Sequence, residues 1–283
     1  MKQRIDFETG FSLVELAIVL VVVALLLGGL LVPLTMQIEQ QKIRETNKTM
    51  EEIKEALIGY ALSHSSTPNN RPYLPCPDVT AAVSGQGGMV PNDGLEDRCP
   101  DVNGACAAVG GPGYCPVAEG NVPWSTLGVA DGDGWGNRMR YRVHPKFSFS
   151  GVASATTDGF QLATSLASPT IRVCTGNACV STLATAVPVV ILSHGKNGLG
   201  AINLAGNVNP QPIAEALDEA QNANSMSGSP NRNFTSRTIT GAQSPCSDSA
   251  PGPTMPLCEF DDLVTWLSPN ILFNRMVAAG RLP

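Results

Sequence analysis

The sequence has little charge, few aromatic residues and no cluster of basic residues. Of its 283 residues, 15% are charged and 5% are aromatic, and the formal net charge is −6. Proteins that bind nucleic acid through its phosphates carry Lys and Arg grouped into a basic patch or stripe. No such stripe occurs here, so we expect no nucleic-acid partner.

The motifs of two large enzyme classes are also missing. The chain has no Gly-x-Ser-x-Gly turn to present a nucleophilic serine, and no phosphate-binding loop. Ser193 and His194 are neighbours in a predicted strand, so their side chains point to opposite faces and cannot form a catalytic pair. We therefore expect a protein that is not an enzyme.

Glycine and proline, by contrast, are abundant, with 28 and 22 residues. Both exceed average usage, and both interrupt regular structure. Beyond residue 62 they separate short apolar segments, such as residues 138–143 and 188–193, which are typical of strands. The composition predicts a loop-rich body of the β type.

One long apolar run lies near the N-terminus. Residues 16–34 carry no charged side chain, and as a helix they would measure about 28 Å, close to the ~30 Å hydrocarbon core of a bilayer. Glu15 stands at the start of this run, where a carboxylate entering a bilayer is costly and calls for a partner. The run predicts a membrane-spanning helix over residues 11–34.

Residues 35–62 continue in a helical pattern. Apolar residues recur mostly three, four or seven positions apart, and charged residues lie between them. Such spacing is typical of an amphipathic helix with one face on a core. We expect one continuous helix whose second half has this apolar stripe: Met36, Ile43, Met50, Ile53, Leu57, Ile58 and Ala61.

Residues 10–16 read Gly-Phe-Ser-Leu-Val-Glu-Leu immediately before the apolar run. This segment resembles the cleavage and methylation motif of type IV pilins and type II secretion pseudopilins. The resemblance implies that residues 1–10 are a leader removed by prepilin peptidase after Gly10, and that Phe11 becomes the N-methylated first residue. Glu15 is then the fifth mature residue, which pairs with the Phe11 amine of a neighbouring subunit.

The same resemblance implies a fold, a location and a function. The fold is α+β: a long N-terminal helix, half membrane and half amphipathic, packed on an antiparallel sheet with loop-rich, disulfide-stapled insertions. The location is the inner membrane, crossed once, with the C-terminal domain in the periplasm and later in a pilus or pseudopilus. The function is that of a structural subunit, and the long body suggests a minor one.

Two alternatives remain beside that interpretation. The head could serve as an adhesin or ligand-binding module displayed on a pilus. Without processing, the chain could instead be a membrane-anchored periplasmic binding protein. The expected partners are other pilin or pseudopilin subunits, the prepilin peptidase and the inner membrane, and the sequence leaves open whether the assembly is a pilus or a secretion pseudopilus.

The predicted head covers residues 63–283 and divides by composition. Residues 63–122 are rich in Cys and Pro, 123–204 contain the strands of a sheet core, and 205–256 form a polar excursion. Within the excursion, residues 212–223 are a short helical candidate. In the C-terminal element, 257–283, we expect a strand or short helix over 260–268 and a helix over 270–279.

The eight cysteines predict disulfides. Their number is even, no Cys-x-x-Cys occurs and the histidines are scattered, so bridges in an oxidising compartment are favoured over zinc. We expect Cys174 to pair with Cys179 across a two-residue Gly-Asn hairpin turn, and Cys246 with Cys258 across a Pro-rich loop. The remaining four pair among themselves in one of three ways: Cys76, Cys99, Cys106 and Cys115.

Two acidic clusters are candidates for calcium. Asp131 and Asp133 begin like an EF-hand loop, but Trp at its fifth position and Arg at its twelfth exclude that motif. Asp93, Glu96 and Asp97 form the second cluster. An ordinary Asx-rich turn is the favoured alternative at both places, and no cofactor is expected.

Overall fold

The computed structural model describes residues 12–67, 69–82, 89–100, 106–107, 111–151, 158–167, 170–223 and 231–282, without the side chains of 26–34. The predicted cleavage and methylation positions, Gly10 and Phe11, lie outside the described residues. The chain divides into two compact units, Met1–Arg44 and Glu45–Pro283. We describe each unit separately.

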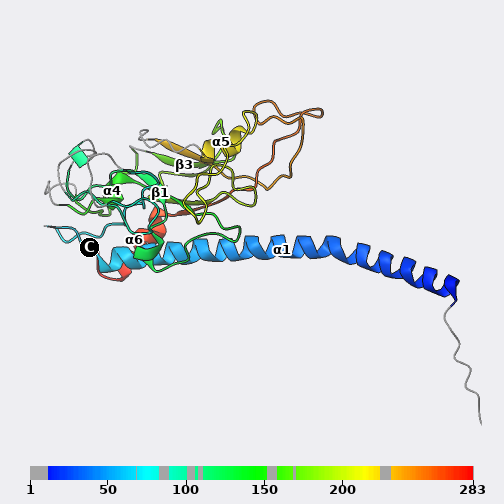
Figure 1. Ribbon diagram of the computed structural model, residues 1–283. Coiled ribbons are helices and arrows are strands. Elements are labelled where there is room, and N and C mark those ends of the chain that lie inside the picture. Colours follow the sequence, from blue (N-terminus) through cyan, green and yellow to red (C-terminus); the bar gives the residue numbers. More distant parts are fainter. Residues whose placement is uncertain are drawn as a thin grey trace, which may run out of the picture. The chain divides into compact units, whose positions relative to one another are not determined.

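Helix α1 extends from Leu13 to Ser63 (Figure 1). Ser12 begins it with a capping box: the Glu15 backbone N–H donates to Ser12 Oγ at 3.2 Å, and the Ser12 N–H donates to Glu15 Oε2 at 2.9 Å. These two bonds satisfy donors that a helix N-terminus otherwise leaves unpaired. The prediction of one continuous helix through residues 35–62 is confirmed.

The membrane prediction is wrong. Across the described residues, no helix combines the length and apolar character that crossing a bilayer requires. The membrane half of the predicted pilin fold and the single-pass inner-membrane location are corrected accordingly.

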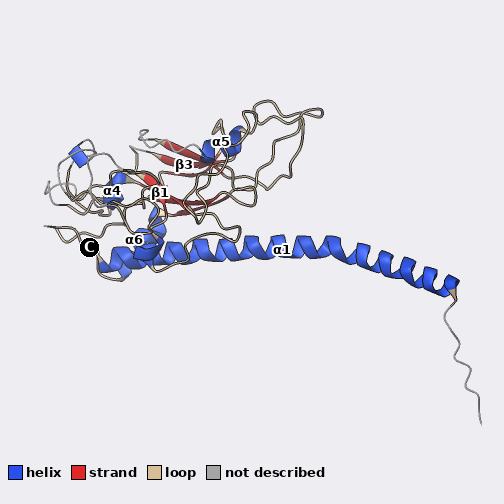
Figure 2. Cartoon of the chain, viewed as in Figure 1, coloured by secondary structure: helices blue, strands red, loops and turns tan. Residues whose placement is uncertain are grey.

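The head contains a four-stranded antiparallel sheet in the order β1-β2-β5-β7. Figure 2 draws the strands of the head in red. Its strands are Glu119–Asn121, Arg140–Val143, Val189–Ser193 and Leu263–Leu267. The two central strands coincide with the predicted strands at 138–143 and 188–193. Of the two options for residues 260–268, the structure selects a strand.

The main core lies between this sheet and the second half of α1. Met50, Ile53 and Leu57 of the predicted helix stripe are buried in one cluster with Tyr141 of β2 and Ile191 of β5. Fully burying a side chain of this size contributes about 1.5–3 kcal/mol. The helical periodicity therefore correctly predicted which face of α1 meets the head.

A second sheet corrects the expectation of antiparallel pairing alone. Its order is β4-β3-β6, and β3 (Ile171–Cys174) pairs parallel with β6 (Arg232–Thr235) and antiparallel with β4 (Thr182–Thr185). The second sheet packs on the other face of β5, whose five residues are all buried. Burial on both faces explains why β5 is apolar throughout rather than alternating.

Short helices complete the head: α3 Trp124–Leu127, α4 Pro145–Ser148, α5 Leu217–Ala223 and α6 Pro269–Ala278. Helix α6 confirms the prediction at 270–279 almost residue for residue. Helix α5 occupies only the second part of the candidate at 212–223. The parallel partner strand β6 follows α5, so the polar excursion contributes regular structure to both layers of the head.

Four disulfides are formed: Cys76–Cys115, Cys99–Cys106, Cys174–Cys179 and Cys246–Cys258. The two predicted pairs are confirmed, and the first four cysteines pair among themselves. The predicted two-residue turn is wrong, because Cys174 lies opposite Thr182 in the ladder. Cys179 instead belongs to a longer loop, where its φ of 51° is left-handed.

Candidate functional site

Glu15, the predicted assembly residue, lies in the first turn of α1 and is exposed. Hydrogen bonds from the Ser12 backbone and side chain lower the pKa of the Glu15 carboxyl, so it is ionised at neutral pH. A negative charge is also favoured at this end of a helix by the helix dipole. Sequence reasoning missed this capping role, although Ser-x-x-Glu before an apolar run is its signature.

The surface behind Glu15 is apolar on all sides. Large side chains from Leu13 to Leu25 are each more than 40% exposed: Leu13, Val14, Leu16, Ile18, Val19, Leu20, Val21, Val22, Val23 and Leu25. Several of them line a shallow groove along the helix, at Leu13, Val14, Ala17, Ile18, Val21 and Val22. A contiguous apolar surface of this extent marks a place where another molecule binds.

The calcium candidates Asp93, Glu96 and Asp97 are used for local structure. Asp93 Oδ1 accepts from the Leu95 N–H at 2.9 Å, which is an Asx turn. Asp97 accepts from a backbone N–H, and Glu96 accepts from the Arg98 guanidinium at 2.9 Å. The structure does not bring these carboxylates together around a common point.

Asp131 and Asp133 also hold a turn. Asp133 Oδ1 accepts from the backbone N–H groups of Trp135 and Asn137, both at 2.9 Å, and its Oδ2 accepts from the Ser193 hydroxyl at 2.6 Å. Burial raises the pKa of Asp133. Asp131 Oδ2 forms an ion pair with Arg138 Nη1 at 3.2 Å, two residues before β2. The favoured Asx-turn alternative describes this site.

A buried charge network was missed by sequence reasoning. Glu119 of β1 is fully enclosed and lies 2.9 Å from Arg232 Nε, 3.4 Å from Arg140 Nη1 and 3.6 Å from Arg142 Nη1. Arg140 and Arg142 belong to β2, which pairs with β1, the strand that contains Glu119. The network ties the first sheet to β6 of the second.

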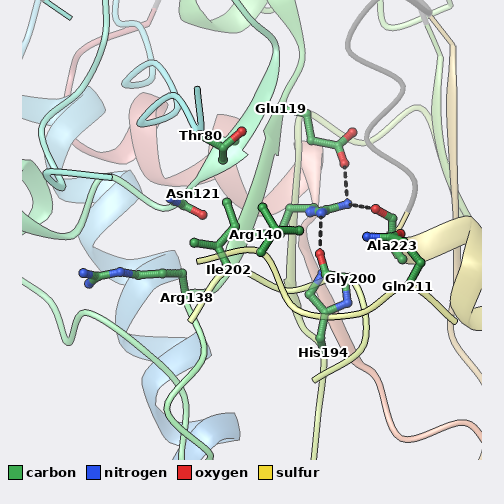
Figure 3. Close-up of a pocket in the computed structure, with 12 residues that line it drawn as sticks. Thr80, Glu119, Asn121, Arg138, Arg140, His194, Gly200, Ile202, Gln211 and Ala223 are labelled. Carbon is green, nitrogen blue, oxygen red and sulfur yellow. Dashed lines mark hydrogen bonds and ion pairs between the residues drawn. The ribbon is translucent and has the colours of Figure 1, made fainter. Parts of the chain in front are cut away.

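Arg140 lies at the centre of a polar cavity (Figure 3). Its guanidinium bonds Glu119 on one side and the carbonyl oxygens of Gly200 and Ala223 on the other. Burial lowers the pKa of Arg140, as does Arg232, while Glu119 opposes that shift. The cavity has a volume of about 110 Å³, and His194 forms part of its wall.

Three buried carboxylates converge beside this cavity. Glu219 of α5 and Asp261 and Asp262, which precede β7, place side-chain oxygens within 4.8 Å of one another. Burial, reinforced by Asp261, raises the pKa of Glu219 to about 7. Burial also raises the pKa of Asp262 well above its ordinary value. From the sequence, Asp261 and Asp262 could serve the surface of the head or an ion, with solvated charges favoured, and Glu219 was not singled out.

No family model, no curated protein and no solved structure matches this chain. The likeness to pilins and pseudopilins therefore rests on residues 10–16 and the helix that follows them, and the function has to be argued from the chain itself.

Proposed function

We propose that this chain is a structural subunit, of the minor kind, of a type IV pilus or type II secretion pseudopilus, which assembles through the N-terminal half of α1. The observation that carries the proposal is the apolar surface from Leu13 to Leu25, with a single ionised residue, Glu15, at its start. Processing after Gly10 would expose that end of the helix.

The apolar surface supports assembly because nothing within the described part of the helix covers it. Each large side chain there would contribute about 1.5–3 kcal/mol if fully buried. The groove between Val14, Ile18 and Val21 is suited to the ridge of a second helix, since helices pack by setting ridges into grooves. Copies of the same helix carry the same ridges, so a bundle of subunits would bury all of them.

The position of Glu15 supports one fixed alignment of neighbouring helices along the axis of that bundle. Its Oε2 accepts from the Ser12 N–H at 2.9 Å, and its side chain is exposed, so a donor from another subunit can reach the carboxylate. In an apolar bundle this carboxylate would lose water, which is costly unless a cation meets it. The amine created at Phe11 by processing is the cation that the resemblance supplies.

The proposal is tested by replacing Gly10, Glu15 and Ser12 in turn. Gly10→Val should leave the longer, unprocessed chain, as measured by the mass of the purified protein. Glu15→Ala should be processed normally but be depleted at least tenfold from sheared filaments. Ser12→Ala is the matched control, because it removes the side-chain cap and keeps the carboxylate.

Three outcomes decide the test. Normal processing of Gly10→Val would exclude the peptidase site. Normal incorporation of Glu15→Ala would exclude the register role. Equal losses for Ser12→Ala and Glu15→Ala would show that Glu15 acts as a helix cap only, and not through a neighbouring subunit.

A further inference from the structure

The carboxylate cluster of the head has the dimensions of a metal site. The side-chain oxygens of Glu219, Asp261 and Asp262 lie within 4.8 Å of one another, and all three residues are buried. Two ligands that each lie about 2.1 Å from one ion are separated by about 3.0–4.2 Å. Side-chain adjustments of less than about 1 Å therefore bring the three carboxylates into range of a common ion.

Amide donors already orient each carboxylate. The Asn197 side chain donates to Glu219 Oε1 at 2.9 Å, and the Asn197 backbone N–H donates to Asp261 Oδ2 at 2.8 Å. The Asn222 side chain donates to Asp262 Oδ2 at 2.8 Å. Such outer hydrogen bonds hold one oxygen of a ligand and direct the other toward a metal.

A buried histidine points to a ligand independently of the acidic cluster. His194 is 1% exposed, and within the described residues neither of its ring nitrogens makes a hydrogen bond. Its Nδ1 faces the cluster, 3.7 Å from Asp262 Oδ1. Burial, with Arg140 and Arg232, lowers the pKa of His194, so the ring is neutral, which is the form that binds metals.

Backbone conformation brings the histidine and the acidic pair together. Gly195 has φ +59°, and a β-carbon at this position would overlap the carbonyl oxygen of Asp261. Only glycine allows this close approach in a left-handed conformation. The turn after β5 therefore packs directly on the residues before β7.

We propose that Glu219, Asp261, Asp262 and His194 bind one divalent transition-metal ion, of the zinc or manganese class. The imidazole is the reason for this choice, because calcium takes six to eight oxygen ligands whereas zinc and manganese accept mixed nitrogen and carboxylate sets. His194 also lines the polar cavity of about 110 Å³ around Arg140 (Figure 3). The site is independent of assembly through α1.

The experiment measures metal binding by the purified full-length chain after treatment with a chelator. Zn²⁺, Mn²⁺ and Ca²⁺ are titrated separately by calorimetry, and bound metal is counted by elemental analysis. We expect one Zn²⁺ or Mn²⁺ per chain and a melting temperature that rises with the concentration of that ion. All eight cysteines are in disulfides, so thiolates do not compete.

Substitutions by glutamine, which keep a polar side chain of similar size, identify the residues that bind the metal. His194→Gln and Glu219→Gln should each weaken Zn²⁺ binding at least tenfold, while circular dichroism verifies that they are folded. Asp133→Asn is the matched control, since it neutralises another buried carboxylate that is outside the cluster, and it should bind Zn²⁺ as the wild type does.

The results that would overturn the proposal are specific. Absence of Zn²⁺ and Mn²⁺ binding by the folded wild type would exclude the site. Binding of Ca²⁺ alone, unchanged by His194→Gln, would exclude the nitrogen ligand and with it the transition metal. Equal weakening by Asp133→Asn would place the ion elsewhere.

Discussion

The N-terminal half of α1 and the head differ in where they place their apolar side chains and their charges. From Leu13 to Leu25 the helix exposes its apolar side chains and satisfies its one charge, Glu15, at its own first turn. The head encloses its apolar residues and buries charges as well, with Glu119 among arginines. The head encloses its apolar side chains within one chain, whereas the described side chains of the first half of the helix are exposed.

The comparison predicts that the largest effect comes from breaking the buried charge network. Glu119→Ala leaves Arg140, Arg142 and Arg232 without their shared carboxylate, which should cost about 3–5 kcal/mol of unfolding free energy. Urea denaturation with intact disulfides measures this loss. The control is Arg275→Ala, which removes an exposed pair with Glu55 at 3.2 Å and should cost less than about 1 kcal/mol. Similar losses of unfolding free energy for both variants would contradict the prediction that the buried network contributes more to stability than the exposed ion pair.

A second prediction compares two apolar residues of the same helix. Leu57→Ala removes a side chain that is 0% exposed in the main core and should cost about 2–5 kcal/mol. Ile18→Ala removes one that is 59% exposed, so the head should keep its stability to within about 0.5 kcal/mol. Chemical denaturation gives both values. If Ile18→Ala unfolded the head, the first half of α1 would belong to the folding unit of the head.

The smallest expected effect is a pH dependence in the head. Burial raises the pKa of Asp78 to about 7, with a contribution from Asp97, while the N–H of Gly94 opposes the shift. The folded state therefore holds the proton between about pH 4 and pH 7, whereas the unfolded state releases it near pH 4. Stability should fall as the pH rises through this window, and Asp78→Asn should flatten the curve. Urea midpoints from pH 4.5 to 8 test this, and an unchanged slope in the variant would assign the dependence to other groups.

Local patterns predicted the parts of this protein that depend on near neighbours. The stripe that includes Met50 and Leu57 identified the buried face of α1, and continuous apolar residues identified β5. Cys174–Cys179 and Cys246–Cys258 are close in sequence, so spacing was enough to pair them. The turns at Asp93 and Asp133 likewise follow from Asx chemistry within a few residues.

Failures occurred where one partner lies far away along the chain. The parallel pairing of β3 with β6 joins segments about 60 residues apart, and no local pattern specifies it. The uncharged apolar run over residues 16–34 predicted a membrane span, but no helix among the described residues is long and apolar enough for one. The arginines of β2 lie near Glu119 in another strand, and no local pattern predicts that partner.

The sequence by itself determined the continuous helix, its apolar first half, the central strands and the short-range disulfides, because each depends on contacts between nearby residues or on the period of one element. Only the tertiary structure decided which charges are buried together. His194, Glu219 and the pair Asp261–Asp262 come from three separate segments. They meet because β5 pairs with β7, and because Asn197 in the turn after β5 donates to Glu219 of α5. The chemistry of Glu219, Asp262 and His194 depends on that enclosure, since burial in a low dielectric raises the pKa of both carboxyls and lowers that of the imidazole.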